Sequence, residues 1–370
     1  MRRKIYQELL QWKQRSGESA LLVQGARRVG KSYIVEAFAK AEYKSYILID
    51  FNLVDQPVKE MFEHDLVDLK TFFMKLTTYY GVKLYERESL IIFDEVQLFP
   101  RARSAIKYLV ADGRYDYIET GSLISIRENV KDILIPSEED HVDMYPLDFE
   151  EFLWANGNDT MMDFIRDCYR KKAPLGQALH RKAMDLFRQY LIVGGMPQAV
   201  NAFVKHNDFD EVDRVKRRIL NLYRDDIRKH AKGYEMKVEA IYDEIPSQMK
   251  NQNQHFKLSS LKQGARFDEY KDAMFWLSDA MIVNHCYNAT EPTFGLNLNR
   301  DRTLLKCYMG DTGLLISHAF DENGIVTGEV YKKLLLDKLE VNMGMVMENM
   351  VAQMLTASGH KLYFYSNSSR

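Results

Sequence analysis

Residues 25–32 read Gly25-Ala26-Arg27-Arg28-Val29-Gly30-Lys31-Ser32, and they follow the apolar run Ala20-Leu21-Leu22-Val23. The two glycines allow the backbone to curl so that successive N–H groups point inward, and a helix beginning here adds the positive end of its dipole. The pattern G-x-x-x-x-G-K-S between a strand and a helix is typical of a loop that holds phosphates. We therefore predict that residues 25–33, up to Tyr33, bind a nucleoside triphosphate, with Lys31 on the β- and γ-phosphates and Ser32 on Mg²⁺.

The composition is that of an ordinary globular protein with two or three domains. The chain has 370 residues, of which 46% are hydrophobic and 28% charged, and its formal net charge is −2. This charge gives no global reason to expect nucleic acid, although a local basic face stays open. Cys168, Cys286 and Cys307 are far apart and fit no metal site or disulfide framework. No apolar stretch is long enough to cross a bilayer, so we expect a cytoplasmic protein without membrane association.

Hydrophobic periodicity predicts alternating strands and helices in the first part of the chain. Strands are expected at residues 20–23, 46–51, 90–93 and 117–120. Helices are expected around Ile5, Leu9 and Trp12, after Lys31, and over residues 58–80. This alternation predicts a doubly wound parallel α/β sheet.

The pattern changes after Pro146. Residues 148–240 have the periodicity of successive helices, interrupted by Gly194-Gly195-Met196-Pro197, and short helices continue to about residue 290. From Leu304 onward we expect strands and a helix over residues 343–357. The strand predicted at residues 362–365 ends the chain without an evident partner, which suggests an incomplete final domain.

Two carboxylates follow the predicted strand at residues 90–93. Ligands of open parallel sheets bind at the carboxyl ends of the strands, where Asp94 and Glu95 lie. We assign Asp94 to the Mg²⁺ site and Glu95 to general-base work on an attacking water. The alternative is a solvated acidic loop. A carboxylate directly after the Mg²⁺ aspartate favours hydrolysis over a third interpretation, a P-loop kinase.

Thr120-Gly121-Ser122 follows the next predicted strand. If that strand lies between the other two in the sheet, Ser122 faces the γ-phosphate and reports its presence. We therefore place Ser122 beside Lys31 and Glu95 among the predicted catalytic residues. The alternative is an ordinary Gly-Ser turn.

Taken together, the motifs resemble a large prokaryotic family of uncharacterised AAA-like P-loop ATPases. In chain order they are the loop at residues 25–32, Phe93-Asp94-Glu95-Val96-Gln97, Thr120-Gly121-Ser122, residues 145–152 (YPLDFEEF), Gly194-Gly195-Met196-Pro197 and Asp311-Thr312-Gly313-Leu314. The resemblance covers essentially the whole chain. It implies ATP as the nucleotide, strand order 5-1-4-3-2, and functional roles for Lys31, Ser32, Asp94, Glu95 and Ser122.

The same resemblance implies four segments. These are an ATPase domain (residues 1–150), a helical lid (151–240), a winged-helix-like segment (241–300) and part of a restriction-endonuclease-like domain (301–370). Many relatives carry an arginine shortly before the Pro-Leu-x-Phe motif, but residues 135–140 have none. Arg101, Arg103 and Arg127 are left as candidates for the arginine that senses the γ-phosphate. Glu348 matches the first helix of the endonuclease-like domain, and one carboxylate does not hold a two-metal site, so we expect no DNA cleavage.

Basic residues suggest further partners. Lys250, Lys257, Lys262, Arg266 and Lys271 lie in the winged-helix-like segment, where they contact nucleic acid or only solvate the lid. The run Arg214 to Arg218 follows Asp210, Glu211 and Asp213, so a salt-bridged exposed face is the favoured interpretation.

We therefore expect a Mg²⁺-dependent ATPase whose hydrolysis drives or gates movement of the lid. The alternative is a nucleotide-dependent switch, associated with DNA or a protein partner, that has negligible turnover. An unknown protein partner is expected in either case.

Overall fold

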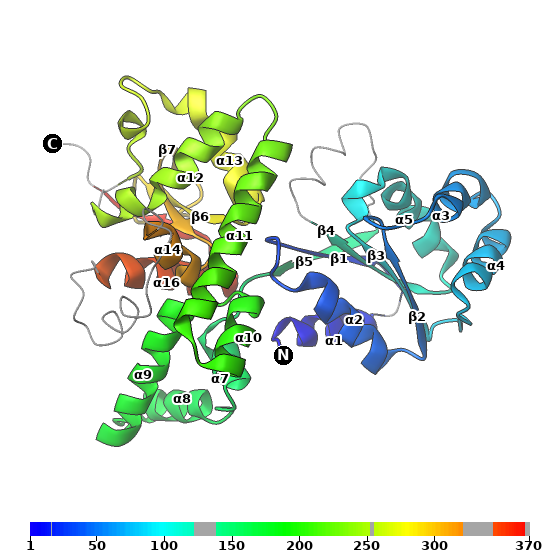
Figure 1. Cartoon of the computed structure of the whole chain (residues 1–370), viewed down its shortest axis with the longest axis horizontal. Helices are drawn as coiled ribbons and strands as arrows, with labels where there is room; N and C mark the ends of the chain where they lie inside the picture. Colours follow the sequence, from blue (N-terminus) through cyan, green and yellow to red (C-terminus); the bar gives the residue numbers. More distant parts are fainter. Residues whose placement is uncertain (16, 122–137, 252–254, 321–342, 367–370) are drawn as a thin grey trace. The chain divides into compact units, whose positions relative to one another are not determined.

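The computed structural model describes residues 1–370 except 16, 122–137, 252–254, 321–342 and 367–370 (Figure 1). Contacts between Cα atoms divide the chain into two compact units. The N-terminal unit is Arg3–Met144, and the C-terminal unit comprises Met1–Arg2 and Tyr145–Arg370. The four segments predicted from the sequence stay a prediction.

The N-terminal unit is built on a five-stranded parallel sheet. Its strands are β1 (Ala20–Gly25), β2 (Ser45–Asp50), β3 (Ser89–Asp94), β4 (Asp116–Gly121) and β5 (Glu139–Met144). Their order in the sheet is β2-β3-β4-β1-β5, which is the predicted order 5-1-4-3-2 in the opposite direction. The predicted α/β fold class is therefore confirmed, and β4 lies between β1 and β3 as the interpretation of residues 120–122 required.

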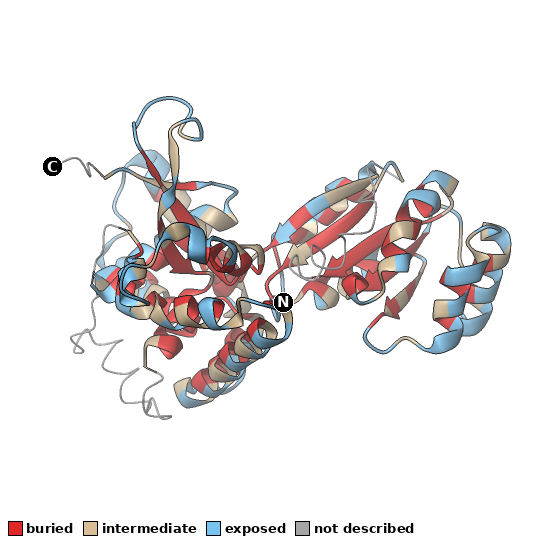
Figure 2. Ribbon diagram, turned by 90° about the horizontal axis from the view of Figure 1, so that it is seen from above, coloured by how far each residue is buried: buried red, intermediate tan, exposed pale blue. Residues whose placement is uncertain are grey.

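Helices cover both faces of this sheet. They are α1 (Ile5–Gln14), α2 (Lys31–Glu42), α3 (Gln56–Glu60), α4 (Leu69–Tyr80) and α5 (Pro100–Asp112). One face packs on α1 and α2 through side chains such as Leu9 and Phe38, and the other packs on α3 to α5 through side chains such as Phe72 and Ile106. Every residue of β3 and β4 is buried, as expected for strands covered on both sides (Figure 2).

The helix predicted over residues 58–80 is interrupted, which corrects that expectation. After α3 the chain makes a π-helical turn (Met61–Asp65), and α4 starts again at Leu69. The Asp68 side chain accepts hydrogen bonds from the backbone N–H groups of Lys70 and Thr71. Because this cap satisfies the first orphan donors of α4, a new helix begins although the apolar spacing continues.

The C-terminal unit is mainly helical. Its described helices are α7 (Phe149–Ala155), α8 (Met161–Lys171), α9 (Gln177–Val193), α10 (Pro197–His206), α11 (Phe209–His230), α12 (Glu235–Lys250), α13 (Phe267–Asp279), α14 (Thr312–Ala319) and α16 (Met343–Ala357). A short 3-10 turn lies at Leu258–Ser260 in this unit, and another lies at Val96–Leu98 in the N-terminal unit. The predicted run of helices and its break at residues 194–196 are confirmed.

A small sheet completes this unit. Strands β6 (Val283–Ala289) and β7 (Arg300–Met309) are antiparallel, and β8 (Leu362–Phe364) pairs in parallel with β6. Cys286 pairs with Leu362 in this register. The expectation that the last strand has no partner was therefore wrong.

Three sequence motifs meet in one buried hydrogen-bond network, the motif junction (Leu147, Tyr190, Gly195, Asp311 and Gln353). The Leu147 N–H donates to Gly195 O over 2.7 Å, and the Tyr190 hydroxyl donates to Leu147 O over 2.9 Å. The Gly195 N–H donates to Asp311 Oδ2 over 2.6 Å, and Gln353 Nε2 donates to the Tyr190 hydroxyl over 3.2 Å. A Cβ on Gly195 would lie 2.1 Å from Leu147 O, so only glycine fits here.

The basic run at residues 214–218 does not form the uniformly salt-bridged exposed face that was predicted. Lys216 is fully buried and donates to Ile192 O over 2.7 Å. Arg217 pairs with Asp213 over 2.6 Å, whereas Arg214 and Arg218 are exposed and form no ion pair with a described residue. An α-helix has about 3.6 residues per turn, so five consecutive residues cover all sides of the helix and one of them faces the core.

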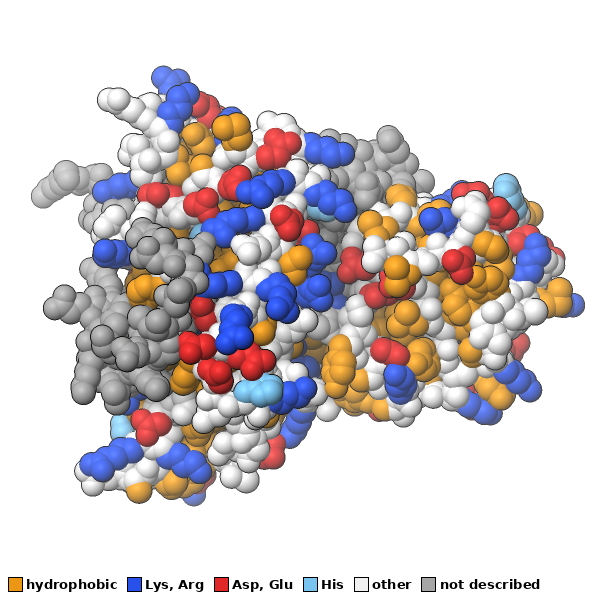
Figure 3. All heavy atoms as spheres, in the orientation of Figure 1, with side chains coloured by type: hydrophobic (Ala, Val, Ile, Leu, Met, Phe, Trp, Pro, Cys, Tyr) orange, Lys and Arg blue, Asp and Glu red, His pale blue; other side chains and the backbone are white. Residues whose placement is uncertain are grey.

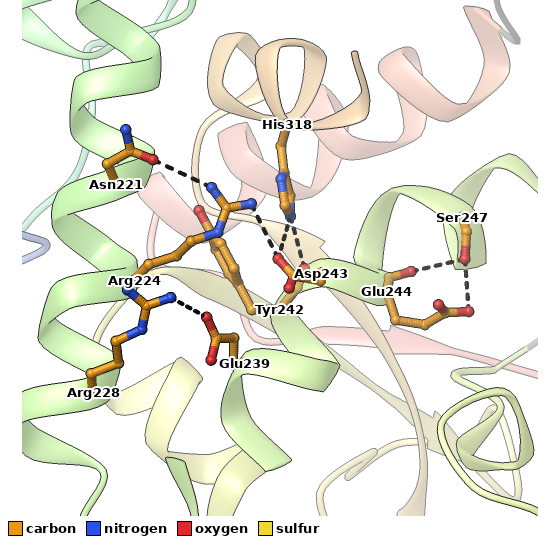
Figure 4. A network of polar contacts seen from close by, with 9 residues as sticks. All are labelled: Asn221, Arg224, Arg228, Glu239, Tyr242, Asp243, Glu244, Ser247 and His318. Atoms are coloured by element: carbon orange, nitrogen blue, oxygen red, sulfur yellow. Dashed lines mark hydrogen bonds and ion pairs between the residues drawn. The ribbon is translucent and has the colours of Figure 1, made fainter. Parts of the chain in front are cut away.

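Further along α11, arginines pair with acids of α12 (Figure 4). Arg224 Nη2 lies 3.2 Å from Asp243 Oδ1, and Arg228 Nη2 lies 2.8 Å from Glu239 Oε1. His318 of α14 lies 2.9 Å from Tyr242 O through its Nε2 and stacks on the Tyr242 ring. These arginines therefore join helices within the unit.

Among the described residues, no helix is long and apolar enough to span a membrane. Cys168, Cys286 and Cys307 are free and buried.

Candidate nucleotide-binding site

The loop between β1 and α2 has the backbone shape of an anion-binding nest. Gly30, directly before α2, has φ 99°, and Arg28 has φ 69°, so both adopt left-handed conformations. Gly25 lies where a Cβ would come within 2.4 Å of Met144 O, so β1 and β5 approach closely at this point. The loop thus needs glycine at both of its ends for separate reasons.

Lys31 is buried inside this loop. Its Nζ donates to Gly25 O over 2.9 Å and to Ala26 O over 3.1 Å. The ammonium therefore lies in the cradle that the loop forms. Arg27, Arg28 and Tyr33 are exposed, whereas Ala26 and Val29 are buried in the fold.

Arg3 supports the loop from the other side of its backbone. Its side chain is 7% exposed, and Nη1 donates to Val29 O over 3.2 Å. Sequence reasoning missed this residue, because a lone arginine near the N-terminus gives no local indication of what it contacts.

Oxygen donors suited to Mg²⁺ lie together at the ends of β3 and β4. Ser32 Oγ donates to Asp94 Oδ1 over 2.8 Å, and the Thr120 hydroxyl donates to the same oxygen. Asp94 is 8% exposed. A hydroxyl and a carboxylate within hydrogen-bonding distance of each other are the oxygen ligands that Mg²⁺ prefers, so the residues present fit this ion.

Glu95 is held in an unusual conformation beside them. Its φ of 53° lies in the left-handed region, which is uncommon for a residue other than glycine. Its N–H donates to Thr120 Oγ1 over 3.3 Å, and its Oε2 accepts from Gln97 Nε2. The left-handed conformation ends the extended course of β3 at this residue.

The structure brings Lys31, Ser32, Asp94 and Glu95 to one edge of the sheet, but Ser122 lies outside the described residues. Thr120 and Gln97, which it places beside the two carboxylates, had been quoted within motifs without a role. The signal that was available for Thr120 is its position at the buried end of a strand beside β3.

Arg103 is excluded as an arginine that senses a phosphate. Its side chain is 2% exposed and pairs with Glu119 over 3.3 Å and with Glu139 over 3.0 Å. Burial and the neighbouring Glu139 raise the pKa of Glu119 well above its usual range, against the opposing effect of Arg103. Arg127 lies outside the described residues, and Arg101 donates to Phe62 O over 3.3 Å.

Family models match two parts of the chain. Residues 17–153 match the model described as an AAA domain, and residues 184–323 match a domain of unknown function. No curated protein matches the chain.

The chain is also similar to solved structures, and one of these has a TM-score above 0.5. The Walker-type ATPase PABY2304 of Pyrococcus abyssi is 13% identical with a TM-score of 0.51, and the match covers 86% of this chain and 95% of that one. The ORC1 protein of Aeropyrum pernix in complex with DNA is 10% identical, with a TM-score of 0.32 over 88% of this chain and 94% of that one. DnaA of Aquifex aeolicus bound to AMPPCP is 12% identical, with a TM-score of 0.33 over 75% and 89%. The latter two scores are too low to carry weight here.

The strand order, the loop around Lys31 and the family match over residues 17–153 agree with one another. They agree with an AAA-type P-loop domain over residues 17–153, the kind of domain that binds ATP.

Proposed function

We propose that this protein hydrolyses ATP with Mg²⁺ at the loop of residues 25–33, and that hydrolysis drives or gates movement of the helical segment that follows. The observation that carries the proposal is the group Lys31, Ser32, Asp94 and Glu95 at one sheet edge. A cation, a hydroxyl and two carboxylates at one edge of the sheet are the groups that phosphoryl transfer to water requires.

Each residue has a distinct role in this proposal. The Lys31 ammonium, which contacts loop carbonyls in the structure, stabilises the negative charge of the β- and γ-phosphates. Ser32 and Asp94 would hold Mg²⁺, which neutralises phosphate charge when bound. Glu95 polarises the attacking water and accepts its proton, while Gln97 and Thr120 fix the carboxylate and backbone of Glu95. Ser122 stays the proposed reporter of the γ-phosphate.

The proposed movement rests on how the chain leaves the sheet. Strand β5 ends at Met144, whose carbonyl lies against Gly25 of the phosphate loop. Leu147, three residues later, is fixed in the motif junction through its backbone N–H, which donates to Gly195 O, and its carbonyl, which accepts from the Tyr190 hydroxyl. A change in the loop on nucleotide binding therefore has a short covalent route to the C-terminal unit.

Steady-state phosphate release tests the chemistry. Glu95→Gln is expected to bind ATP within about threefold of wild type while hydrolysis falls by about a hundredfold or more, because the water loses its base. Lys31→Ala is expected to lose ATP binding itself, and Glu60→Gln, at an exposed glutamate of the same unit, is the control. If wild type and Glu95→Gln bind ATP and are equally inert, the protein is the alternative, a nucleotide-dependent switch.

Amide hydrogen exchange tests the movement. With Mg²⁺ and ATP, exchange in residues 145–155 is expected to change in wild type and not in Lys31→Ala. Unchanged exchange in wild type at saturating ATP contradicts lid movement while leaving the ATPase proposal intact.

A further inference from the structure

The turn between α8 and α9 carries an unusual concentration of positive charge. From Cys168 to Met184 the chain contains Arg170, Lys171, Lys172, Arg181 and Lys182 and no aspartate or glutamate, although acids slightly outnumber bases in the whole chain. We call residues 169–182 the basic turn. Figure 3 shows Lys and Arg side chains over this end of α8 and α9, at the lower left of the view.

Most of these cations have no acidic partner. Lys171 pairs with Asp167 over 2.6 Å. Arg170, Lys172, Arg181 and Lys182 are exposed and form no ion pair with any residue that the structure describes. In α11, by contrast, Arg224 and Arg228 pair with acids of the neighbouring helix (Figure 4). The charges of the basic turn are therefore available to a ligand.

Helix stability does not explain why these cations are present in the basic turn. Lys172 has φ 51°, a left-handed conformation in which glycine or asparagine ends a helix at lower cost. Arg181 and Lys182 lie near the positive end of α9, whose first turn has no acidic residue. Only Arg170 and Lys171, in the last turn of α8, favour the helix dipole.

Backbone hydrogen bonds fix the conformation of the turn, and the ring of Tyr169 is exposed on it. The N–H of Ala173 donates to Cys168 O over 2.9 Å, that of Lys172 to Tyr169 O over 3.1 Å, and that of His180 to Gly176 O over 2.9 Å. Tyr169 is 84% exposed, and it directly precedes Arg170, Lys171 and Lys172 in the sequence. Cations around an exposed aromatic side chain fit a strand of phosphates whose unpaired bases stack on the ring.

We propose that the basic turn binds single-stranded nucleic acid, with Arg170, Lys172, Arg181 and Lys182 on phosphates and Tyr169 against a base. A membrane surface fits less well, because Tyr169 is the only large apolar side chain of this turn that is more than half exposed, and surface helices insert an apolar face. The segment predicted to be winged-helix-like is also a weaker candidate, because its basic residues lie among exposed Asp268, Glu269 and Asp272 on α13.

Fluorescence anisotropy with a labelled oligothymidylate of about 20 nucleotides tests the proposal, since one site covers roughly 4–16 nucleotides. The variant R170A/K172A/R181A/K182A is expected to bind about tenfold or more weakly, and the slope of log K against log salt to fall by nearly 3, about 0.7 for each lost phosphate contact. The control K257A/K262A/R266A/K271A removes the same charge from the winged-helix-like segment and is expected to bind like wild type. Absence of wild-type binding, or equal loss in both variants, overturns the proposal.

Two single variants separate binding from folding. Lys172→Gly is expected to weaken binding without lowering the melting temperature, because glycine suits the left-handed position. Tyr169→Ala is expected to weaken binding and Tyr169→Phe to retain it, since the ring and not the hydroxyl stacks. Equal binding of Tyr169→Ala and wild type, or binding to phosphatidylserine vesicles but not to the oligonucleotide, contradicts the proposal.

Discussion

The phosphate loop and the motif junction both gather sequence motifs, but they use them in opposite ways. At the loop, Gly30 and Arg28 give the backbone left-handed conformations, and the loop curls around the Lys31 ammonium, which bonds its carbonyls. At the junction, Gly195 allows two stretches of backbone to touch, and every polar group named there bonds another part of the same unit. A glycine-rich motif therefore indicates close backbone approach, and only the surroundings decide whether a ligand or the protein itself is approached.

A substitution at Gly195 is the strongest test of this difference between the two regions. Gly195→Ala puts a methyl group 2.1 Å from Leu147 O, so we expect the free energy of unfolding of the C-terminal unit to fall by about 3 kcal/mol or more. Thermal denaturation measures the loss, and ATP binding by the N-terminal unit is expected to persist at low temperature. Gly359→Ala is the comparison, because Gly359 has a positive φ that Gly195 lacks but no neighbour within 4 Å, so it costs backbone strain alone and a smaller loss is expected. Equal stability of Gly195→Ala and wild type contradicts this account of the junction.

Lys216, beside the junction, is expected to make stability depend on pH. Burial lowers the pKa of Lys216 to about 8, against the opposing effect of Asp213 and Asp311. Between pH 8 and pH 10.5 the unfolded chain keeps a proton that the folded chain has lost, so this residue makes stability rise with pH across that window. The full change amounts to about 3 kcal/mol, at 1.36 kcal/mol per pKa unit.

Urea denaturation at several pH values measures this effect. Stability of Lys216→Met is expected to gain less between pH 8 and pH 10.5 than that of wild type, whereas Lys229→Met, at an exposed lysine of α11, is expected to follow wild type. Parallel pH profiles of the stability of wild type and Lys216→Met contradict this interpretation.

The smallest expected effect concerns Thr120. Its hydroxyl joins Asp94 to the backbone of Glu95, so Thr120→Val removes one donor from the carboxylate while keeping the shape of the side chain. Phosphate release is expected to slow by about tenfold, or about 1.4 kcal/mol in the barrier, with little change in melting temperature. Thr78→Val, at an exposed position of α4, serves as the control. Unchanged hydrolysis in Thr120→Val shows that Ser32 alone positions Asp94.

Several elements could not be predicted from the periodicity of the sequence, each for a physical reason. Strand β5 escaped residue-level prediction because it is an edge strand with exposed polar side chains, in which only Val142 and Met144 are buried. The break before α4 was missed because a capping aspartate interrupts a helix without disturbing apolar spacing. Gln97 gave no signal of its own, since hydrogen bonding to Glu95 depends on a turn with positive φ that the pattern does not specify.

By itself the sequence determined the phosphate loop, the two carboxylates after β3 and the alternation that gives a parallel sheet. These features are local: a turn, a strand end and a period of burial are set by residues adjacent in the chain. Only the tertiary structure decided that Thr120 meets Asp94, that Arg103 contacts Glu119 and Glu139, and that Leu147, Gly195 and Asp311 form one junction. Those partners are separated by tens of residues, and which of them meet depends on the packing of whole elements.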